Sequence, residues 1–329
     1  MNRIIKPSKI KKGSHIRIIA PARSLGLLSE ENKKDAINRL ENFGFKLSFG
    51  KNVNDIDEFY SSSIEARVND IHDAFKDKKV DAILTVIGGY NSNQLLKYID
   101  YKLIEENPKI ICGFSDITAL GGAITSKTGM ITYMGPHFSS WAMKYGFEYS
   151  LDYFIKCCVE EAPYELLPSK QWSDDPWYAN QEKRNFIENN GYWIINHGHG
   201  IGKIVGGHAR CINSLQGTDY WPGFDNSILI IEEDAEINPT LFDRQLQSLI
   251  HQSDFNGVQG ILIGRFQKDT KMTKDLLFKI INTKKELKNI PIIANVDFGH
   301  TTPIATIPIG GTMEINADDE KIMIKIIQH

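Results

Sequence analysis

Hydrophobic and polar positions follow two patterns in the first half of the chain, and these predict strands that alternate with helices. Short apolar runs such as HIRIIAPA, DAILTVI and KIICG have the length of buried strands. The segments SEENKKDAINRLENFG and IEARVNDIHDAFKDKKV have apolar residues at helical spacing, and Ser29 and Gly44 lie where the first helix should begin and end. This alternation is typical of a mostly parallel sheet with helices on both faces.

The pattern stops between residues 160 and 202, where the chain is polar, aromatic and rich in glycine and asparagine. We interpret this segment as a linker that forms a long loop, and its three tryptophans argue against disorder. The runs GKIVGG, SILIIEE, GVQGILIG and IPIIANV then predict further strands, with helical patterns at 240–251 and 273–285 and a terminal hairpin.

Together these patterns predict an α/β protein with two domains. The first is a Rossmann-like, flavodoxin-like parallel sheet at residues 1–165, and the second is a β-rich α/β domain at residues 201–329. Residues 166–200 form the linker and its aromatic loop. A length of 329 residues fits two hydrophobic cores.

Composition narrows the classes of partner. The net charge of −3 gives no basic field for nucleic acid or for an anionic membrane, and no apolar run reaches the roughly 18 to 20 residues that span a bilayer. The N-terminus lacks a signal-peptide pattern, so we expect a cytoplasmic protein. Four cysteines without a CxxC pair predict reduced thiols rather than a disulfide framework.

Ser115 follows the apolar run KIICG and precedes a helical pattern, which places it at the carboxyl end of the predicted sheet. It could be the N-cap of that helix, or it could be a nucleophile. The GxSxG elbow of the α/β-hydrolases is absent. Gly88 and Gly89 end the preceding strand and form either a plain tight turn or a place where backbone N–H groups face an oxyanion.

A serine nucleophile needs a base and a group that orients the base. His300 follows the strand IPIIANV among turn residues, although a lone histidine there could be structural. Carboxylates cluster directly after the strand SILII, where Glu232 and Glu233 are candidates and a solvated loop is the alternative. His197 and His199 suggest a metal pair, but no third ligand has a recognisable spacing, and we predict no metal site.

In order and context these segments match one family. The chain resembles the serine peptidases that comprise the LD-carboxypeptidases and the microcin C self-immunity proteins. The matching segments are GSHIRIIAPARS, IGGYNSNQLL, CGFSDITAL, MGPH, GKIVGGHARCINSLQGT, SILIIEEDAE, GILIGRF and NVDFGHTTPIATIPIGG.

The resemblance implies a Ser-Glu-His triad, which maps onto Ser115, Glu232 and His300. The 68 positions between Glu232 and His300 favour Glu232 over Glu233. By the same resemblance, the N–H groups of Gly89 and Asp116 form the oxyanion hole. No cofactor is implied.

Binding residues follow from the same resemblance. We expect Gly88 and Tyr90, in the glycine turn, to contact substrate. Where family members commonly have GGN, this chain has Gly206-Gly207-His208, so His208 either replaces the asparagine amide as a donor or simply packs.

The long tryptophan-bearing segment resembles the microcin immunity branch, in which a ring stacks on the adenine of an aminoacyl nucleotide. Trp177 is the first candidate for that ring and Trp172 the second, and the alternative is that both pack between the domains. We therefore expect a hydrolase that cleaves the amide or phosphoramide-linked bond of an aspartyl-adenylate-like substrate.

Two other functions stay open. One is an LD-carboxypeptidase of murein tetrapeptides with the same triad. The other is a non-catalytic nucleotide-binding protein, which the lack of a GxGxxG or Walker motif disfavours. We expect a small peptide or aminoacyl nucleotide as partner and, from the resemblance, a homodimer.

Overall fold

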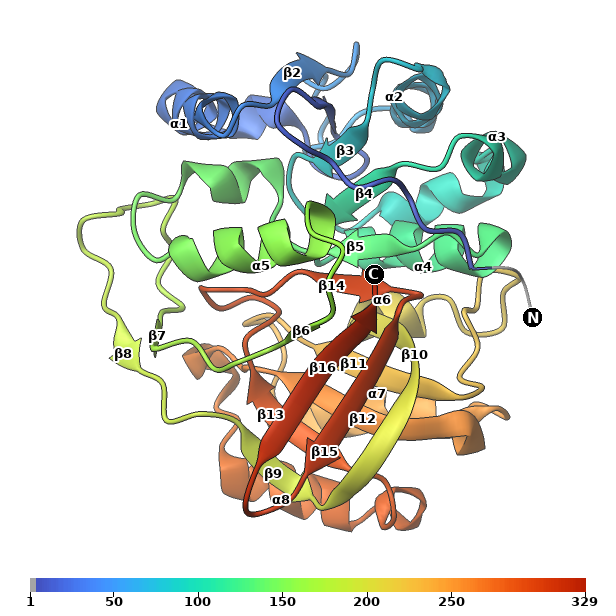
Figure 1. Cartoon of the computed structure of the whole chain (residues 1–329), viewed down its shortest axis with the longest axis vertical. Coiled ribbons are helices and arrows are strands. Elements are labelled where there is room, and N and C mark those ends of the chain that lie inside the picture. The colour runs from blue at the N-terminus through green and yellow to red at the C-terminus, as the bar shows by residue number, and fades with distance from the viewer. Residues whose placement is uncertain (1–3) are drawn as a thin grey trace.

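Two sheets with helices beside them make up the structure, a computed structural model that describes residues 4–329. The N-terminal half forms the upper layers in Figure 1, and the C-terminal half, yellow to red, lies below. This arrangement confirms the predicted α/β class, with a parallel sheet flanked by helices and a β-rich second part.

The first sheet has six strands in the order β14-β5-β4-β3-β1-β2. All neighbours are parallel except β14, which runs antiparallel to β5 and comes from the C-terminal part of the chain. The strands are β1 (His15–Ile19), β2 (Lys46–Phe49), β3 (Ala82–Thr85), β4 (Ile110–Gly113), β5 (Thr132–Met134) and β14 (Ile307–Ile309).

Alternate residues of each strand point to opposite sides of this sheet, and apolar side chains on both sides are covered by helices. Leu84 packs into the core cluster that contains α1, η3 and α5, whereas Ile83 packs into the cluster that contains α2, η2, α3 and α4. Ser29 caps α1 as predicted, since its hydroxyl accepts from the Asn32 N–H. The elements are α1 (Glu30–Asn42), α2 (Ile64–Lys76), η2 (Ser92–Tyr98), α3 (Tyr101–Glu106), α4 (Ile117–Thr128), η3 (Phe138–Ala142) and α5 (Glu148–Cys158).

The second sheet has eight strands in the order β6-β16-β15-β10-β11-β12-β13-β9. Its four central strands, β10 to β13, are parallel, and the outer strands pair antiparallel. The strands are β6 (Tyr164–Glu165), β9 (Trp193–Asn196), β10 (Gly198–His208), β11 (Ser227–Glu232), β12 (Val258–Gly264), β13 (Ile292–Val296), β15 (Thr312–Ala317) and β16 (Ile322–Gln328). The helices of this part are α6 (Ala209–Asn213), α7 (Pro239–Ile250) and α8 (Lys274–Asn282).

The segment between residues 160 and 202 is less irregular than its composition predicted. It contains the short pair β7 (Gln171–Trp172) and β8 (Ile187–Glu188), and β9 is the edge strand of the second sheet. The polar and glycine residues around β9 give no periodic pattern that would predict a strand. The strand forms because it pairs with β13, about a hundred residues away in the sequence.

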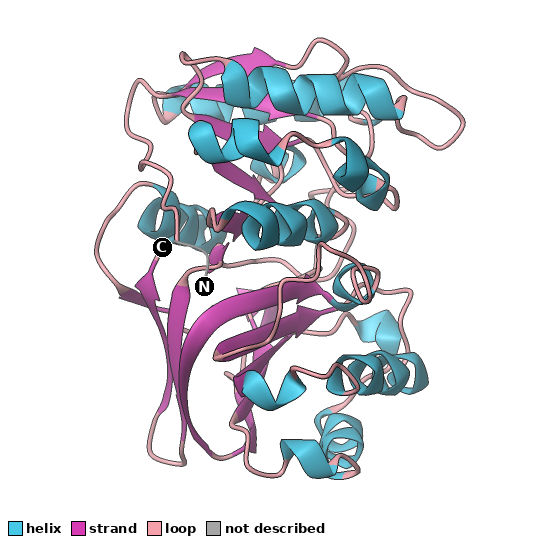
Figure 2. Ribbon diagram, turned by 90° about the vertical axis from the view of Figure 1, so that its right-hand side faces the viewer, coloured by secondary structure: helices cyan, strands magenta, loops and turns pink. Residues whose placement is uncertain are grey.

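Helix α4 joins the two halves. Figure 2 shows helices between the upper and lower sheets, and α4 contacts both β10 and α6. The Thr118 hydroxyl accepts from the His208 N–H at 3.0 Å. A Cβ on Gly207, whose φ is +133°, would lie only 2.6 Å from that hydroxyl, so the close approach requires glycine. The helix after Ser115 therefore packs directly on the strand that ends at His208.

Among residues 4–329, no helix is long and apolar enough to cross a membrane.

Candidate active site

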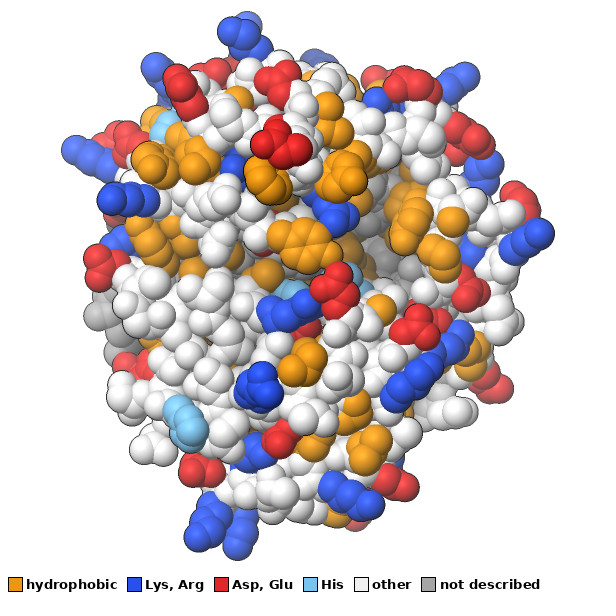
Figure 3. Space-filling model, turned by 180° about the vertical axis from the view of Figure 1, so that it is seen from behind, with side chains coloured by type: hydrophobic (Ala, Val, Ile, Leu, Met, Phe, Trp, Pro, Cys, Tyr) orange, Lys and Arg blue, Asp and Glu red, His pale blue; other side chains and the backbone are white. Residues whose placement is uncertain are grey.

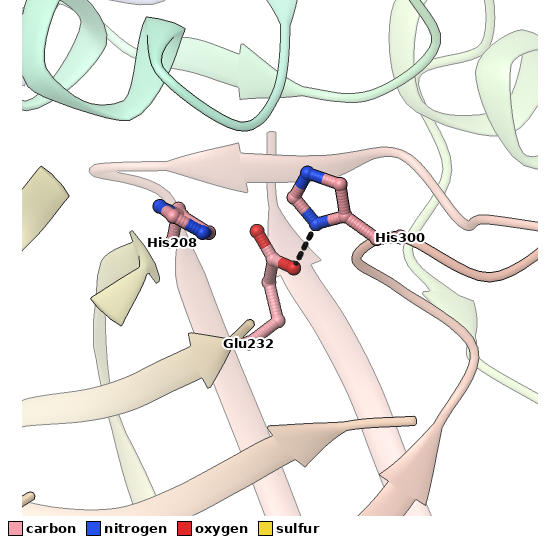
Figure 4. A group of neighbouring side chains, drawn as sticks. All are labelled: His208, Glu232 and His300. Atoms are coloured by element: carbon pink, nitrogen blue, oxygen red, sulfur yellow. Dashed lines mark hydrogen bonds and ion pairs between the residues drawn. The ribbon is translucent and has the colours of Figure 1, made fainter. Parts of the chain in front are cut away.

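Side chains from three strand ends meet where the two halves of the molecule face each other. Ser115 lies two residues after β4, Glu232 is the last residue of β11, and His300 lies four residues after β13. The distance from Ser115 Oγ to His300 Nε2 is 3.0 Å, and that from His300 Nδ1 to Glu232 Oε2 is 2.7 Å. Figure 4 shows this second contact as a dashed line. The three side chains thus form a continuous hydrogen-bonded chain.

The backbone of Ser115 is in the left-handed region, with φ of 61°. Non-glycine residues rarely adopt this conformation, and it occurs at sites where the fold enforces a particular side-chain direction. Asp116, not Ser115, occupies the N-cap position of α4. The Ser115 hydroxyl points instead to His300, so the structure does not use it as a helix cap.

Glu232 and not Glu233 contacts His300. The Glu232 side chain is fully buried, and a Cβ on Gly299 would lie 2.7 Å from its Oε2, so the glycine lets the histidine loop approach closely. An ionised carboxylate accepts the Nδ1–H of His300, which leaves Nε2 free to accept the proton of the Ser115 hydroxyl. This is the tautomer that a general base requires.

Free backbone donors lie beside Ser115. The N–H groups of Gly89 and Asp116 donate to no residue within 4–329, and both residues line the same cavity as Ser115. A Cβ on Gly88 would lie 2.9 Å from the Ser115 Cβ, which explains why this turn contains glycine. The arrangement offers two donors for an oxyanion.

The Asp116 carboxylate holds the glycine turn in place. Its Oδ2 accepts from the N–H groups of Asn91 at 3.0 Å and Ser92 at 2.9 Å. Burial raises the pKa of Asp116, although these hydrogen bonds act in the opposite direction. The residue after the serine therefore ties the turn to the start of α4.

His208 is buried beside an acidic cluster. Its Nε2 lies 3.3 Å from Glu233 Oε2 and 3.7 Å from Asp234 Oδ2, and its Nδ1 lies 3.1 Å from Cys211 Sγ. Burial by itself would lower the pKa of His208, but the contacts with Asp234, Cys211 and Glu233 raise it well above its usual range. These acidic contacts favour the protonated form of His208, which lines the cavity.

Arg210 and Tyr90 complete this cluster. The Arg210 guanidinium pairs with Glu233, Asp234 and Glu236. The Tyr90 hydroxyl donates to Glu236 Oε1 at 2.7 Å, so the glycine turn of the first half is attached to the acidic cluster of the second.

A second buried imidazole lies close to the serine. His137 Nδ1 is 2.8 Å from Thr85 Oγ1, and its ring stacks against Phe114 with centroids 4.4 Å apart. Burial, with a smaller contribution from the neighbouring His300, lowers the pKa of His137 to about 3, which keeps it neutral. The segment MGPH, which contains His137, is among those that resemble the family, but the sequence alone indicated no role for this histidine.

These residues surround one cavity of about 560 Å³. Figure 3, which views the molecule from behind relative to Figure 1, shows this cavity as a hollow near the middle of the face. Histidine atoms lie inside it, and charged and hydrophobic side chains surround its rim. Trp177 and the largely exposed Tyr178 line it, and Tyr178 and Arg23 were not singled out from the sequence.

Trp172, the second candidate for the stacking ring, lies apart from the residues that line the cavity. Its ring, on β7, packs against the Arg265 guanidinium at 5.1 Å and the Lys268 ammonium at 5.4 Å. Cation–π contact with these side chains gives Trp172 a packing role.

Two groups of side chains bring metal-ligand atoms within 4.8 Å of one another: His208 with Glu232 and His300, and His208 with Glu233 and Asp234. In the first group Glu232 is already bonded to His300, and in the second the Arg210 guanidinium supplies the positive charge. Neither donor set is therefore arranged for a cation. His197 and His199 contact Asp319 and Glu314 instead.

Comparison with known proteins adds independent information. Residues 16–135 match the family model of the LD-carboxypeptidase N-terminal domain, and residues 201–315 match that of the C-terminal domain.

Several relatives align over most of their length. YocD of Bacillus subtilis (strain 168), whose name assigns it provisionally to the carboxypeptidases, is 52% identical over 98% of this chain and 99% of its own. The microcin C7 self-immunity protein MccF of Escherichia coli is 29% identical over 87% of this chain and 85% of its own. A B. subtilis protein, named provisionally as a murein peptide carboxypeptidase, is 26% identical over 97% of this chain and 94% of its own.

Solved structures agree with the fold. The MccF-like protein from Bacillus anthracis str. Ames has a TM-score of 0.98 and 51% identity, covering 99% of this chain and 100% of that one. MccF in complex with aspartyl sulfamoyl adenosine has a TM-score of 0.88 and 26% identity, with 98% of each chain covered.

Proposed function

Because the chain belongs to the LD-carboxypeptidase family of peptidases, we propose that it is a serine hydrolase with Ser115 as nucleophile, His300 as base and Glu232 as the acid that orients the base. The observation that carries this proposal is the hydrogen-bonded chain from Ser115 Oγ through both nitrogens of His300 to Glu232. Its geometry has the nucleophile and the base within direct proton-transfer distance.

In the first half of the proposed reaction, His300 Nε2 takes the hydroxyl proton as Ser115 Oγ attacks the carbonyl carbon of the substrate. The negative charge moves to the carbonyl oxygen, where the free N–H groups of Gly89 and Asp116 would donate to it. His300 then gives its proton to the leaving nitrogen, the carbon–nitrogen bond breaks, and an acyl ester remains on Ser115.

In the second half, a water molecule takes the place of the leaving group. His300 removes its proton while the water oxygen attacks the ester carbonyl, and the same two N–H groups stabilise the second oxyanion. Collapse returns the proton to Ser115 Oγ and releases the carboxylic acid. Throughout, the buried carboxylate of Glu232 stabilises the imidazolium.

For the substrate, we propose an aminoacyl nucleotide that resembles an aspartyl adenylate but is amide- or phosphoramide-linked, so that the bond broken joins the acyl carbon to nitrogen. The cavity of about 560 Å³ has room for such a molecule, and Trp177 offers a ring at its edge. Stacking on a nucleobase is worth about 1 to 3 kcal/mol per base. The neighbour MccF has been solved with aspartyl sulfamoyl adenosine, which supports this choice by analogy.

The second candidate is hydrolysis of the terminal D-alanine from a murein tetrapeptide by the same three residues. The aligned B. subtilis protein named for murein peptides favours it, as does the family name. Both reactions break an amide-type bond, so the triad is shared and the substrate differs.

Mass spectrometry of products distinguishes the candidates. The purified protein is incubated with aspartyl sulfamoyl adenosine and, separately, with the tetrapeptide, and Ser115→Ala is the control. Release of aspartate alone supports the nucleotide proposal, and release of D-alanine alone supports the second. A folded Ser115→Ala protein with near-normal turnover would refute the serine mechanism, and failure of a fluorophosphonate probe to label Ser115 would favour a non-catalytic binding protein.

We also propose, from the family resemblance, that the protein acts in the cytoplasm as a homodimer. A concentration series by analytical ultracentrifugation that finds only monomer would contradict the dimer.

A further inference from the structure

The charges around the cavity are unevenly compensated. Two arginines line it among the described residues, Arg23 and Arg210, and no lysine does. Arg210 is neutralised by three carboxylates. Arg23 makes no ion pair with any residue in 4–329.

Arg23 is held at the glycine turn, which carries the free N–H of Gly89. Its own backbone N–H donates to the Gly88 carbonyl at 3.3 Å, and a Cβ on Gly89 would lie 3.3 Å from its Cγ. Its guanidinium lies over the Tyr90 ring, 5.0 Å from the centroid, and the Tyr90 hydroxyl is bonded to Glu236. The half-buried side chain is thus supported along its stem and at its end.

The other lining cations are already compensated. His208 and Arg210 contact three carboxylates, those of Glu233, Asp234 and Glu236. Arg23 is the lining guanidinium without an ion-pair partner among residues 4–329, so its charge is available to an anionic group of a ligand.

We propose that Arg23 binds the anionic group on the leaving side of the substrate, an inference that rests on the proposed function. In a phosphoramide-linked aminoacyl nucleotide this group is the phosphate attached to the leaving nitrogen, and in a peptide with a terminal D-residue it is the carboxylate one carbon further on. A guanidinium can donate two parallel hydrogen bonds to either group. Arg23 is thus a substrate-positioning residue next to the Gly89 N–H.

Binding measurements test Arg23 without relying on turnover. Isothermal titration calorimetry compares Ser115→Ala with the double variant that also carries Arg23→Gln. The probes are two pairs that differ by one anionic group: AMP against adenosine, and N-acetyl-D-alanine against its amide. In the Ser115→Ala protein we expect the anion of at least one pair to bind ten-fold or more tightly than its neutral partner, and the pair that shows this identifies phosphate or carboxylate as the ligand.

Arg23→Gln should reduce that preference to about one while leaving the neutral probe's affinity within about two-fold. Arg244→Gln, which removes the same charge from an exposed position on α7 outside the cavity, should leave the preference unchanged. A preference that survives Arg23→Gln, or no preference in either pair, would overturn the inference.

Failure of this inference is distinguishable from failure of the proposed function. Turnover that depends on Ser115 together with an anion preference that survives Arg23→Gln refutes only the role of Arg23. An anion preference that is lost in Arg23→Gln, in a protein whose Ser115 neither reacts with a fluorophosphonate nor supports turnover, supports the anion site and refutes the hydrolase.

Discussion

Replacing Glu232 by glutamine tests the proposed role of the buried acid with little change in volume. Glu232 Oε2 lies 2.7 Å from His300 Nδ1, whereas Oε1 is buried without a hydrogen-bond partner. Figure 4 shows His208 on the side of Oε1. Because the protonated form of His208 is favoured, the amide NH₂ of a glutamine would be repelled from that side.

The glutamine should therefore turn its oxygen toward His208 and its NH₂ toward His300. His300 Nδ1 would then have to accept a hydrogen bond, so the proton would move to Nε2, the atom that must accept the Ser115 proton. An equivalent acid-to-amide change in a serine protease triad lowers kcat by about 10⁴. At about 1.36 kcal/mol per ten-fold, we expect a loss of roughly 5 kcal/mol of transition-state stabilisation.

The assay is kcat for whichever substrate the product analysis identifies, with thermal unfolding to verify the fold. Glu233→Gln is the matched control, since Glu233 is equally buried and adjacent in sequence but contacts Arg210 and His208 instead of His300. We expect Glu233→Gln to keep kcat within ten-fold. The reasoning is refuted if folded Glu232→Gln retains more than a tenth of the wild-type kcat, or if Glu233→Gln loses as much.

Three further changes have defined outcomes. Gly88→Ala places a Cβ 2.9 Å from the Ser115 Cβ, so kcat should fall at least ten-fold while thermal unfolding changes little, and an unaffected kcat would contradict that crowding. Asp297→Ala removes the partner 2.6 Å from the buried Arg265 guanidinium and should lower the free energy of unfolding in urea by about 3 to 5 kcal/mol; a loss under 1 kcal/mol would contradict this. The pKa of His137 is lowered from 6.5 to about 3 in the folded protein. Below pH 6.5 the unfolded state therefore binds a proton at this histidine and the folded state does not. The free energy of unfolding should fall by about 2 kcal/mol between pH 7 and 5. His137→Gln should flatten this pH dependence, and an unchanged slope in urea titrations would count against the lowered pKa.

Local patterns in the sequence were sufficient to predict the strands and helices around the proposed triad. Ser115, Glu232 and His300 each lie at the end of an apolar run or shortly after one, and in the structure each lies at or just after the end of a strand. Local patterns could not decide between Glu232 and Glu233, because the end of a strand can direct either side chain inward. Only the spacing to His300, taken from the family resemblance, favoured Glu232. The geometry brings Glu232 to His300 through the close approach of Gly299.

Features that depend on contacts between residues far apart in the chain could not be predicted from the sequence. Trp172 and Trp177 lie in one polar segment, yet only Trp177 lines the cavity, because Arg265 and Lys268 from the second half cover Trp172. Arg23 lies in the N-terminal segment GSHIRIIAPARS, where no local pattern indicates a binding role. Its position over the Tyr90 ring arises from tertiary packing.

The proposed triad is divided between the two halves of the molecule, and this division has a mechanical consequence. The His300–Glu232 contact lies within the second sheet, whereas the Ser115–His300 contact crosses to the first. The relative position of Ser115 depends on how α4 docks on β10, where Thr118 accepts from the His208 N–H. Small changes in that docking would alter the serine-to-histidine distance while leaving the histidine-to-glutamate pair intact. Since proton transfer requires the first distance to be near 3 Å, the packing of α4 would contribute to the proposed catalysis as directly as the polar side chains that it positions.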